Sequence, residues 1–160
     1  MKQTEMSGYL KMITIGVGVL LAAFAFWFLP LVLKEPLMGA AGESGYRVTC
    51  GLIWLSAVPA LMCLVHFWGI CESIRRNQSF SRENAGRLKR MSQYMLIDTV
   101  LYTGYLVWFF LAGWYQGAAW LIFPVLLAIF ISVTLVVVCA ALSHLVQKAS
   151  EIQEEQELTI

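Results

Sequence analysis

Five ionisable side chains lie in or beside apolar stretches of this 160-residue chain, and their types could do chemistry: Asp98, His66, His144, Arg75 and Glu72. An ionised Asp at the centre of a membrane helix costs roughly 2.5 to 3.5 kcal/mol, so Asp98 needs a partner, water or a proton. Counting along the expected helices places Asp98 and both histidines in the same half of the membrane, with Glu72 and Arg75 slightly closer to the water. A carboxylate and imidazoles at one depth predict a site that passes protons or binds an ion.

A structural role for these residues is the simpler alternative. An Asp within a turn or two of the membrane surface can pair with Arg75 or another basic residue, and a single His in a span often forms an interhelical hydrogen bond. The sequence contains no Gly-rich phosphate loop, no HExxH and no Ser/His/Asp grouping with a supporting motif. Its four cysteines lack metal-ligand spacing. We therefore expect a protein that is not an enzyme and holds no cofactor or metal.

Membrane helices are the elements that must position these side chains. The composition is 59% hydrophobic and 13% charged, with a mean hydropathy of +0.72, which lies outside the range of soluble proteins. Runs of about 20 apolar residues can cross a hydrocarbon core about 30 Å thick. We expect residues 1–160 to form one all-α membrane domain, a four-helix bundle with spans at about 12–33, 48–74, 95–114 and 118–145.

The segments outside these spans differ in character. Residues 34–47 are rich in Gly, Ser and Pro, which predicts a flexible loop after a first span that ends at Pro30 and Pro36. Residues 113–119 predict a turn so short that the third and fourth spans must be antiparallel neighbours. Residues 150–160 predict an acidic, mobile tail.

The connection between the second and third spans, residues 75–94, is basic. It holds six of the eleven Lys and Arg residues, and with Lys2, Lys11 and Lys148 these make nine on one side of the membrane. Only Lys34 and Arg47 fall on the other side, so the positive-inside rule predicts that both termini are cytoplasmic. We expect the basic loop to contact anionic lipid headgroups, at about 1 kcal/mol for each cation near the surface, rather than nucleic acid.

The same loop predicts the start of the third helix. Residues 77–79 interrupt the helical pattern, and Ser81 then has the character of an N-cap, with Glu83 in the first turn. Apolar residues recur at helical spacing from Ala85 onwards. We expect one unbroken helix that begins in the cytoplasm and extends into the third span.

Two segments resemble a known family. The run NQSFSRENAGRLKRMSQY, residues 77–94, and the ending EIQEEQELTI, residues 151–160, are similar to the bacterial domain of unknown function 2975 family. The most specific positions are Phe80, Ser81, Asn84 and Leu88 in the loop and Glu157, Leu158, Thr159 and Ile160 at the end. The resemblance covers essentially the whole chain. It implies a small four-helix protein of the bacterial inner membrane, often encoded beside a Cro/C1-type helix-turn-helix regulator, with no established biochemical activity.

Two interpretations of this motif stay open. In the structural one, Phe80 packs against the inner surface of the bundle, Ser81 caps the helix and Asn84 satisfies exposed backbone where the second span ends. In the functional one, the loop and the acidic tail form a cytoplasmic docking face for a soluble partner such as a DNA-binding regulator. Their opposite charges would hold each other when no partner is bound.

Three hypotheses for function follow. The first is a non-enzymatic membrane protein that senses or sequesters a cytoplasmic transcriptional regulator. The second is a small transporter, permeability or immunity factor that uses the region of Asp98 and His66. The third is a subunit of a larger membrane complex or a homo-oligomer, which small residues on the first span would favour at Gly16, Gly18, Ala22 and Ala25.

Overall fold

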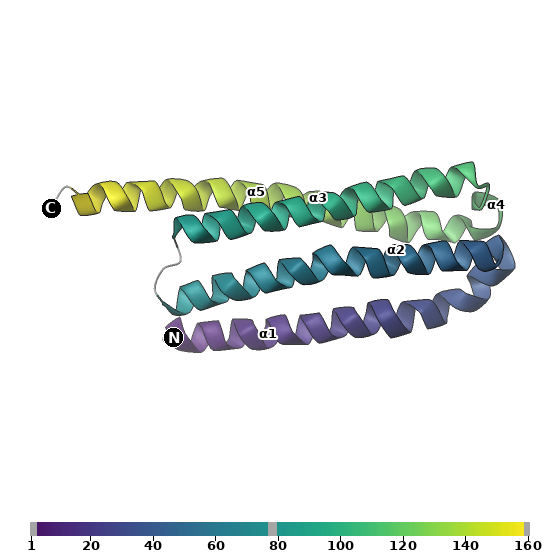
Figure 1. The fold of residues 1–160 in the computed structure, drawn as a ribbon, viewed down its shortest axis with the longest axis horizontal. Helices are drawn as coiled ribbons and strands as arrows, with labels where there is room; N and C mark the ends of the chain where they lie inside the picture. Colours follow the sequence, from purple (N-terminus) through teal and green to yellow (C-terminus); the bar gives the residue numbers. More distant parts are fainter. Residues whose placement is uncertain (1–2, 77–79, 159–160) are drawn as a thin grey trace.

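The chain is helical almost throughout the residues that the structure, a computed structural model, describes, which are 3–76 and 80–158. The chain forms three long helical stretches, and the first folds back on itself so that its two halves also lie next to each other (Figure 1). The first consists of α1 (Gln3–Ala23), the π-helical segment η1 (Phe24–Phe28) and α2 (Leu29–Arg75); the second is α3 (Arg82–Leu111) and the third is α5 (Ile122–Leu158). The short helix α4 (Tyr115–Ala118) and the 3-10 turn η2 (Ala119–Leu121) join α3 to α5.

Each of the three stretches is long and apolar enough to cross a membrane, over Gly8–Arg75, Arg82–Leu111 and Tyr115–Gln156. Their outer faces carry large exposed apolar side chains, with Trp27 77% and Leu111 78% exposed. Contiguous apolar surface of this kind is unfavourable in water and suits contact with lipid. The prediction of an all-α protein whose helices are long and apolar enough to cross a membrane is confirmed.

The first stretch reverses its direction at Gly42, where the backbone has φ +68° and ψ −172°. Essentially only glycine adopts this conformation. The helix continues through Pro30 and Pro36, so the prediction that these prolines end it, before a flexible loop over residues 34–47, is wrong. The π-helical segment η1 lies just before Pro30, and such local adjustments re-satisfy the backbone groups that a proline leaves without a donor.

The last helix is longer than predicted. α5 continues to Leu158, and its final turns project beyond the ends of the other helices (Figure 1). The expected mobile tail over residues 150–160 is therefore helical as far as the structure describes it, and that prediction is wrong. Glu, Gln and Leu have high helix propensity, and extending an existing helix avoids the cost of nucleation.

α3 begins where the sequence predicted. Ser81 is its N-cap, and the Ser81 Oγ accepts a hydrogen bond from the Asn84 backbone N–H at 3.3 Å. Glu83 lies in the first turn, and the helix is unbroken for 30 residues to Leu111. The predicted cap and continuous helix are confirmed, while the interruption predicted at residues 77–79 lies outside the described residues.

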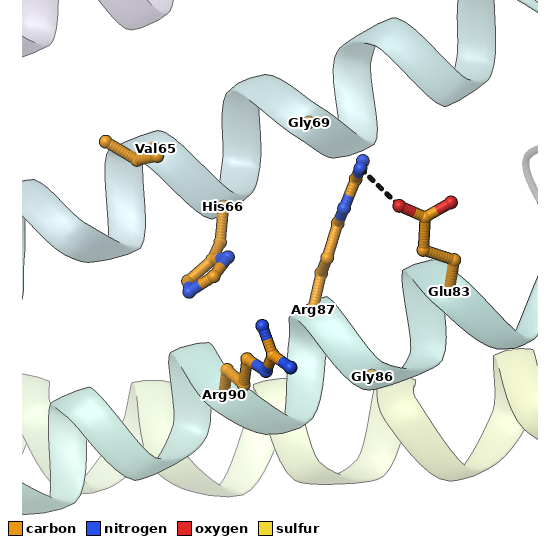
Figure 2. Close-up of a pocket in the computed structure, with 7 residues that line it drawn as sticks. All are labelled: Val65, His66, Gly69, Glu83, Gly86, Arg87 and Arg90. Carbon is orange, nitrogen blue, oxygen red and sulfur yellow. Dashed lines mark hydrogen bonds and ion pairs between the residues drawn. The ribbon is translucent and has the colours of Figure 1, made fainter.

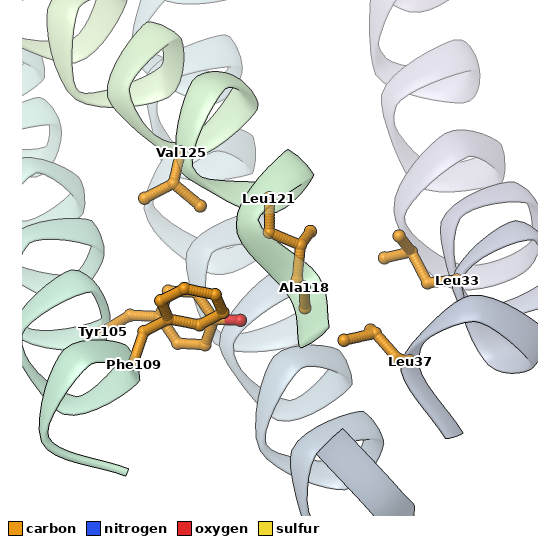
Figure 3. Packing of buried hydrophobic residues seen from close by; sticks show 7 residues of the cluster. All are labelled: Leu33, Leu37, Tyr105, Phe109, Ala118, Leu121 and Val125. Atoms are coloured by element: carbon orange, nitrogen blue, oxygen red, sulfur yellow. The ribbon is translucent and has the colours of Figure 1, made fainter. Parts of the chain in front are cut away.

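The apolar core lies toward the turns at Gly42 and Gly113, because Ala41 and Trp114, the neighbours of these glycines in the sequence, pack against it. Figure 3 shows the side chains of its buried members. Its buried members come from α2, α3, α4, η2 and α5, and they are Leu33, Leu37, Tyr105, Phe109, Ala118, Leu121 and Val125. Hydroxyl pairs also join α2 to α3, since the Thr49 Oγ1 lies 2.8 Å from the Tyr105 Oη and the Ser56 Oγ lies 2.9 Å from the Tyr102 Oη. These contacts join α2 to α3 at the core, through Tyr105, and one turn of α3 away from it, through Tyr102.

Candidate functional site at the terminal end

The terminal end of the molecule is the end where α1 begins, α2 ends, α3 begins and α5 ends (Figure 1). Most basic side chains of the chain lie there, because they belong to the end of α2, the first turns of α3 and the connection between them. Their ion pairs form three groups, which are centred on Glu72, Arg87 and Arg82.

Glu72 is surrounded by three cations. Its Oε2 lies 2.5 Å from the Nζ of Lys11, which also lies 5.1 Å from the ring centroid of Trp68. Its Oε1 lies 2.5 Å from the Nη2 of Arg75 and 3.3 Å from the Nε of Arg76. Lys11 belongs to α1 and Glu72 to the end of α2, so the cluster joins these two helices. Arg75 therefore pairs with Glu72 and does not form the ion pair with Asp98 that the structural alternative offered.

Asp98 lies inside the helical assembly, with 5% of its surface exposed. Its Oδ1 accepts no hydrogen bond from any residue that the structure describes. Over the same residues no group of three His, Cys, Asp or Glu side chains could hold a metal ion. The site therefore offers one buried carboxylate that needs a proton, a water or a cation.

Neither histidine interacts with Asp98 among the described residues. His66 stacks on the ring of Tyr94, with centroids 5.6 Å apart and an interplanar angle of 19°. His144 is exposed on α5. Within the described part of the chain, neither histidine makes a hydrogen bond or ion pair with Asp98, so the three do not form one hydrogen-bonded cluster.

A pocket of about 490 Å³ lies between α2 and α3, and sequence reasoning did not predict it (Figure 2). Its lining comes from α2 at Val65, His66 and Gly69 and from α3 at Glu83, Gly86, Arg87 and Arg90. Gly86 was the available signal, because α3 lacks a side chain there and open space adjoins it. Recognising it requires the register of α2 against α3, which the sequence does not supply.

Arg87 reaches across this pocket from α3 to α2. Its Nη2 lies 2.7 Å from the Oε1 of Glu83, and its Nη1 donates to the Ser73 Oγ at 3.4 Å. A Cβ on Gly69 would lie 2.5 Å from the same Nη1, so the guanidinium occupies the space that the glycine leaves. Arg90, by contrast, makes no hydrogen bond or ion pair with any described residue.

The start of α3 and the end of α5 are joined directly. The Nη2 of Arg82 lies 2.7 Å from the Oε2 of Glu154, and the Ser143 Oγ donates to the backbone oxygen of Ala85 at 2.7 Å. The predicted attraction between the basic loop and the acidic end is confirmed in the Arg82–Glu154 pair. Beyond it, α5 presents exposed Glu151, Glu155 and Ile152, of which the last is 56% exposed.

The residues of the motif lie in different environments. Phe80 is 60% exposed, so the structural interpretation in which it packs against the bundle is wrong for this residue. Asn84 is buried and Leu88 is half-buried. At the other end of the motif, Glu157 and Leu158 close α5 with side chains outside the described part of the chain, and Thr159 and Ile160 lie beyond the described residues.

Comparison with known proteins gives a family and no function. The model of the family described as Protein of unknown function (DUF2975) matches residues 8–160. No curated protein and no solved structure matches the chain. Because the match covers all but the first seven residues, it includes the terminal-end pocket, Asp98 and the motif of residues 80–88. The chain belongs to the DUF2975 family of proteins of unknown function.

Proposed function

We propose that this chain is a non-enzymatic protein of the bacterial cytoplasmic membrane that crosses it four times, with both termini in the cytoplasm. The reversal at Gly42 supports this number of crossings, because it allows α1 and α2 to cross the membrane once each. The distribution of basic residues along the sequence, nine in the segments assigned to the cytoplasm against Lys34 and Arg47 in the external ones, supports the orientation. The start of α3 and the projecting end of α5 then face the cytoplasm together.

We further propose that this end holds or senses a cytoplasmic transcriptional regulator. The observation that carries the proposal is the projection of α5 beyond the bundle as a helix (Figure 1). Its last turns carry Glu151, Glu154 and Glu155, with the exposed apolar side chain of Ile152 among them. An acidic helix with an apolar residue at its centre complements a basic surface that has an apolar pocket.

The resemblance to a family often encoded beside a helix-turn-helix regulator supplies the class of partner. Such a regulator has a basic face for DNA phosphates, and an acidic helix would compete with DNA for that face. In the free protein Arg82 pairs with Glu154. Both side chains are more than half exposed, so the pair contributes at most about 1 kcal/mol and a partner's cations can displace Arg82 at little cost.

The test uses the full-length protein in lipid nanodiscs and the purified regulator encoded beside its gene. Reversing two charges, in Glu151→Lys/Glu155→Lys, should weaken binding about tenfold or more, equivalent to about 1.4 kcal/mol. Glu43→Lys is the matched control, because Glu43 is an exposed acid at the opposite end. Equal binding by all three proteins, or no binding by the unmodified one, would refute the proposal.

A second candidate, a small transporter, permeability or immunity factor, is favoured by one observation. The Oδ1 of buried Asp98 has no hydrogen-bond partner among the described residues, so the carboxylate is available to a proton or a cation. Asp98→Asn keeps the shape of the side chain and removes its ionisation. If Asp98 carries the ion, this substitution should abolish ion-dependent flux or resistance and leave regulator binding intact. Unchanged flux and resistance would eliminate Asp98 as the carrier.

A further inference from the structure

We propose that the pocket between α2 and α3 binds the headgroup of a monoanionic phospholipid from the cytoplasmic leaflet, with an acyl chain in an adjoining apolar groove. The site is distinct from the acidic end of α5, and its occupation does not require a regulator. Its orientation toward the cytoplasmic leaflet rests on the topology proposed above.

The charges lining the pocket fit one phosphodiester. Arg87 is compensated by Glu83 at 2.7 Å, whereas Arg90 is uncompensated within the described residues. The three charges therefore leave a net charge of about +1, which a single phosphodiester neutralises. The planar fork of a guanidinium donates two parallel hydrogen bonds to phosphate oxygens. A zwitterionic headgroup also carries an ammonium, which would lie beside Arg90 and leave the pocket again with a net positive charge.

The pocket has room for the headgroup beside Gly86, where α3 carries no side chain. In Figure 2 the side chains of His66 and Arg90 extend from opposite helices into the space between them. A Cβ on Gly86 would meet nothing within 4 Å, so open space adjoins α3 at this point. The volume of about 490 Å³ suits a glycerophosphate group rather than a single small ion.

An apolar groove begins at the same residue that borders the pocket. Val65 lines both the pocket and a groove of about 390 Å³ between α1 and α2. The remaining walls of the groove are Thr14, Ile15, Gly18, Leu61, Leu64 and Trp68, which lie along the apolar parts of both helices. A cationic site that shares Val65 with an apolar groove fits an amphiphile, because a free phosphate would leave the groove unused. The apolar part of α2 ends within two turns of Val65, the depth at which headgroups lie.

The test measures lipid retention by native mass spectrometry of the full-length protein released from detergent. The probes are phosphatidylglycerol, phosphatidylcholine with the same acyl chains, and free glycerol phosphate. We expect phosphatidylglycerol to be retained about tenfold better than either of the other two. Equal retention of phosphatidylcholine would refute the charge selectivity, and equal binding of glycerol phosphate would refute the role of the groove, so either result overturns the proposal.

Two pairs of variants locate the site. Arg90→Gln should lower phosphatidylglycerol retention about tenfold, whereas Lys89→Gln, which removes the same charge from the next residue of α3, should leave it unchanged because Lys89 borders a different pocket. Gly86→Leu should fill the pocket and abolish retention, whereas Gly104→Leu, also on α3 with open space around it, should not. If Gly86→Leu fails to fold, the first pair decides alone. Equal loss in Arg90→Gln and Lys89→Gln, or no loss in Arg90→Gln, would overturn the proposal.

Discussion

The guanidinium of Arg82, in the first turn of α3, lies 2.7 Å from the carboxylate of Glu154, near the end of α5. The two residues are 72 positions apart in the chain, so the pair brings the basic connection and the acidic end together. Both side chains are more than half exposed, and exposed ion pairs contribute about 0.2 to 1 kcal/mol. The pair therefore positions the projecting turns of α5 and adds little to global stability.

Reversing one charge of this pair should loosen the end of α5. We expect Arg82→Glu to accelerate amide hydrogen exchange in residues 150–156, with a change in global unfolding free energy below about 1 kcal/mol. Adding Glu154→Arg should restore the slow exchange, because the pair re-forms with opposite polarity. Exchange that is unaffected by Arg82→Glu, or that the double variant does not restore, would show that the pair does not hold α5.

A side chain at Gly42, where the first stretch reverses, should destabilise the fold. Its φ of +68° with ψ of −172° lies in a region that costs other residues about 1 to 3 kcal/mol, so Gly42→Ala should lower the unfolding free energy by that amount. The strain is conformational, since a Cβ there would meet nothing within 4 Å. Gly39→Ala is the matched control in the preceding helix, also with open space, and should be neutral or stabilising by about 0.5 to 1 kcal/mol. Equal effects, measured by denaturant unfolding in detergent, would place the reversal elsewhere.

The buried hydroxyl pair between Thr49 and Tyr105 should contribute measurably to the packing of α2 on α3. Tyr105→Phe removes the 2.8 Å hydrogen bond and should cost about 0.6 kcal/mol, and at most about 1.7 kcal/mol, the range measured for such bonds between membrane helices. Tyr115→Phe, which changes an exposed ring, should cost close to nothing. Thermal unfolding of both variants checks the comparison, and equal midpoints would mean that the hydroxyl pair has no energetic role.

Asp98→Asn should not destabilise the fold. The buried Oδ1 has no partner within the described residues, so the substitution removes no hydrogen bond to that oxygen and removes the cost of an ionised group in the membrane. We expect an unfolding midpoint equal to or above that of the unmodified protein. A loss of more than about 1 kcal/mol would instead show that Asp98 is held as an anion by a compensating charge.

Features of the fold that depend on local chemistry could be predicted from the sequence. Ser81 caps α3 as expected because capping needs only one side chain and the next turn of backbone. The reversal at Gly42 and the helical end of α5 could not be predicted in the same way. A proline commonly ends a helix in water, because solvent binds the backbone carbonyl that loses its N–H partner. In a membrane helix a local change of helix type such as η1 can satisfy that carbonyl, so the helix continues through Pro30 and Pro36.

The candidate sites show a similar division. Counting residues along the helices placed Asp98, His66 and His144 in the same half of the membrane. Which of these side chains meet depends on the rotation of each helix about its own axis. That rotation depends on packing, and it buries Asp98, directs His66 toward the pocket and leaves His144 exposed. The cationic pocket between α2 and α3 depends on the register of two helices and so could not be read from either one.

Competition with DNA tests the proposed role of the terminal end most directly. Fluorescence anisotropy of the labelled operator DNA, bound to the regulator encoded beside the gene, would be followed while nanodiscs containing the full-length protein are added. We predict that the unmodified protein displaces the DNA, and that Glu151→Lys/Glu155→Lys displaces it about tenfold less effectively, while Glu43→Lys behaves as the unmodified protein does. DNA that stays bound at saturating nanodisc concentrations, or displacement that is insensitive to the two charge reversals, would contradict docking through the acidic end of α5.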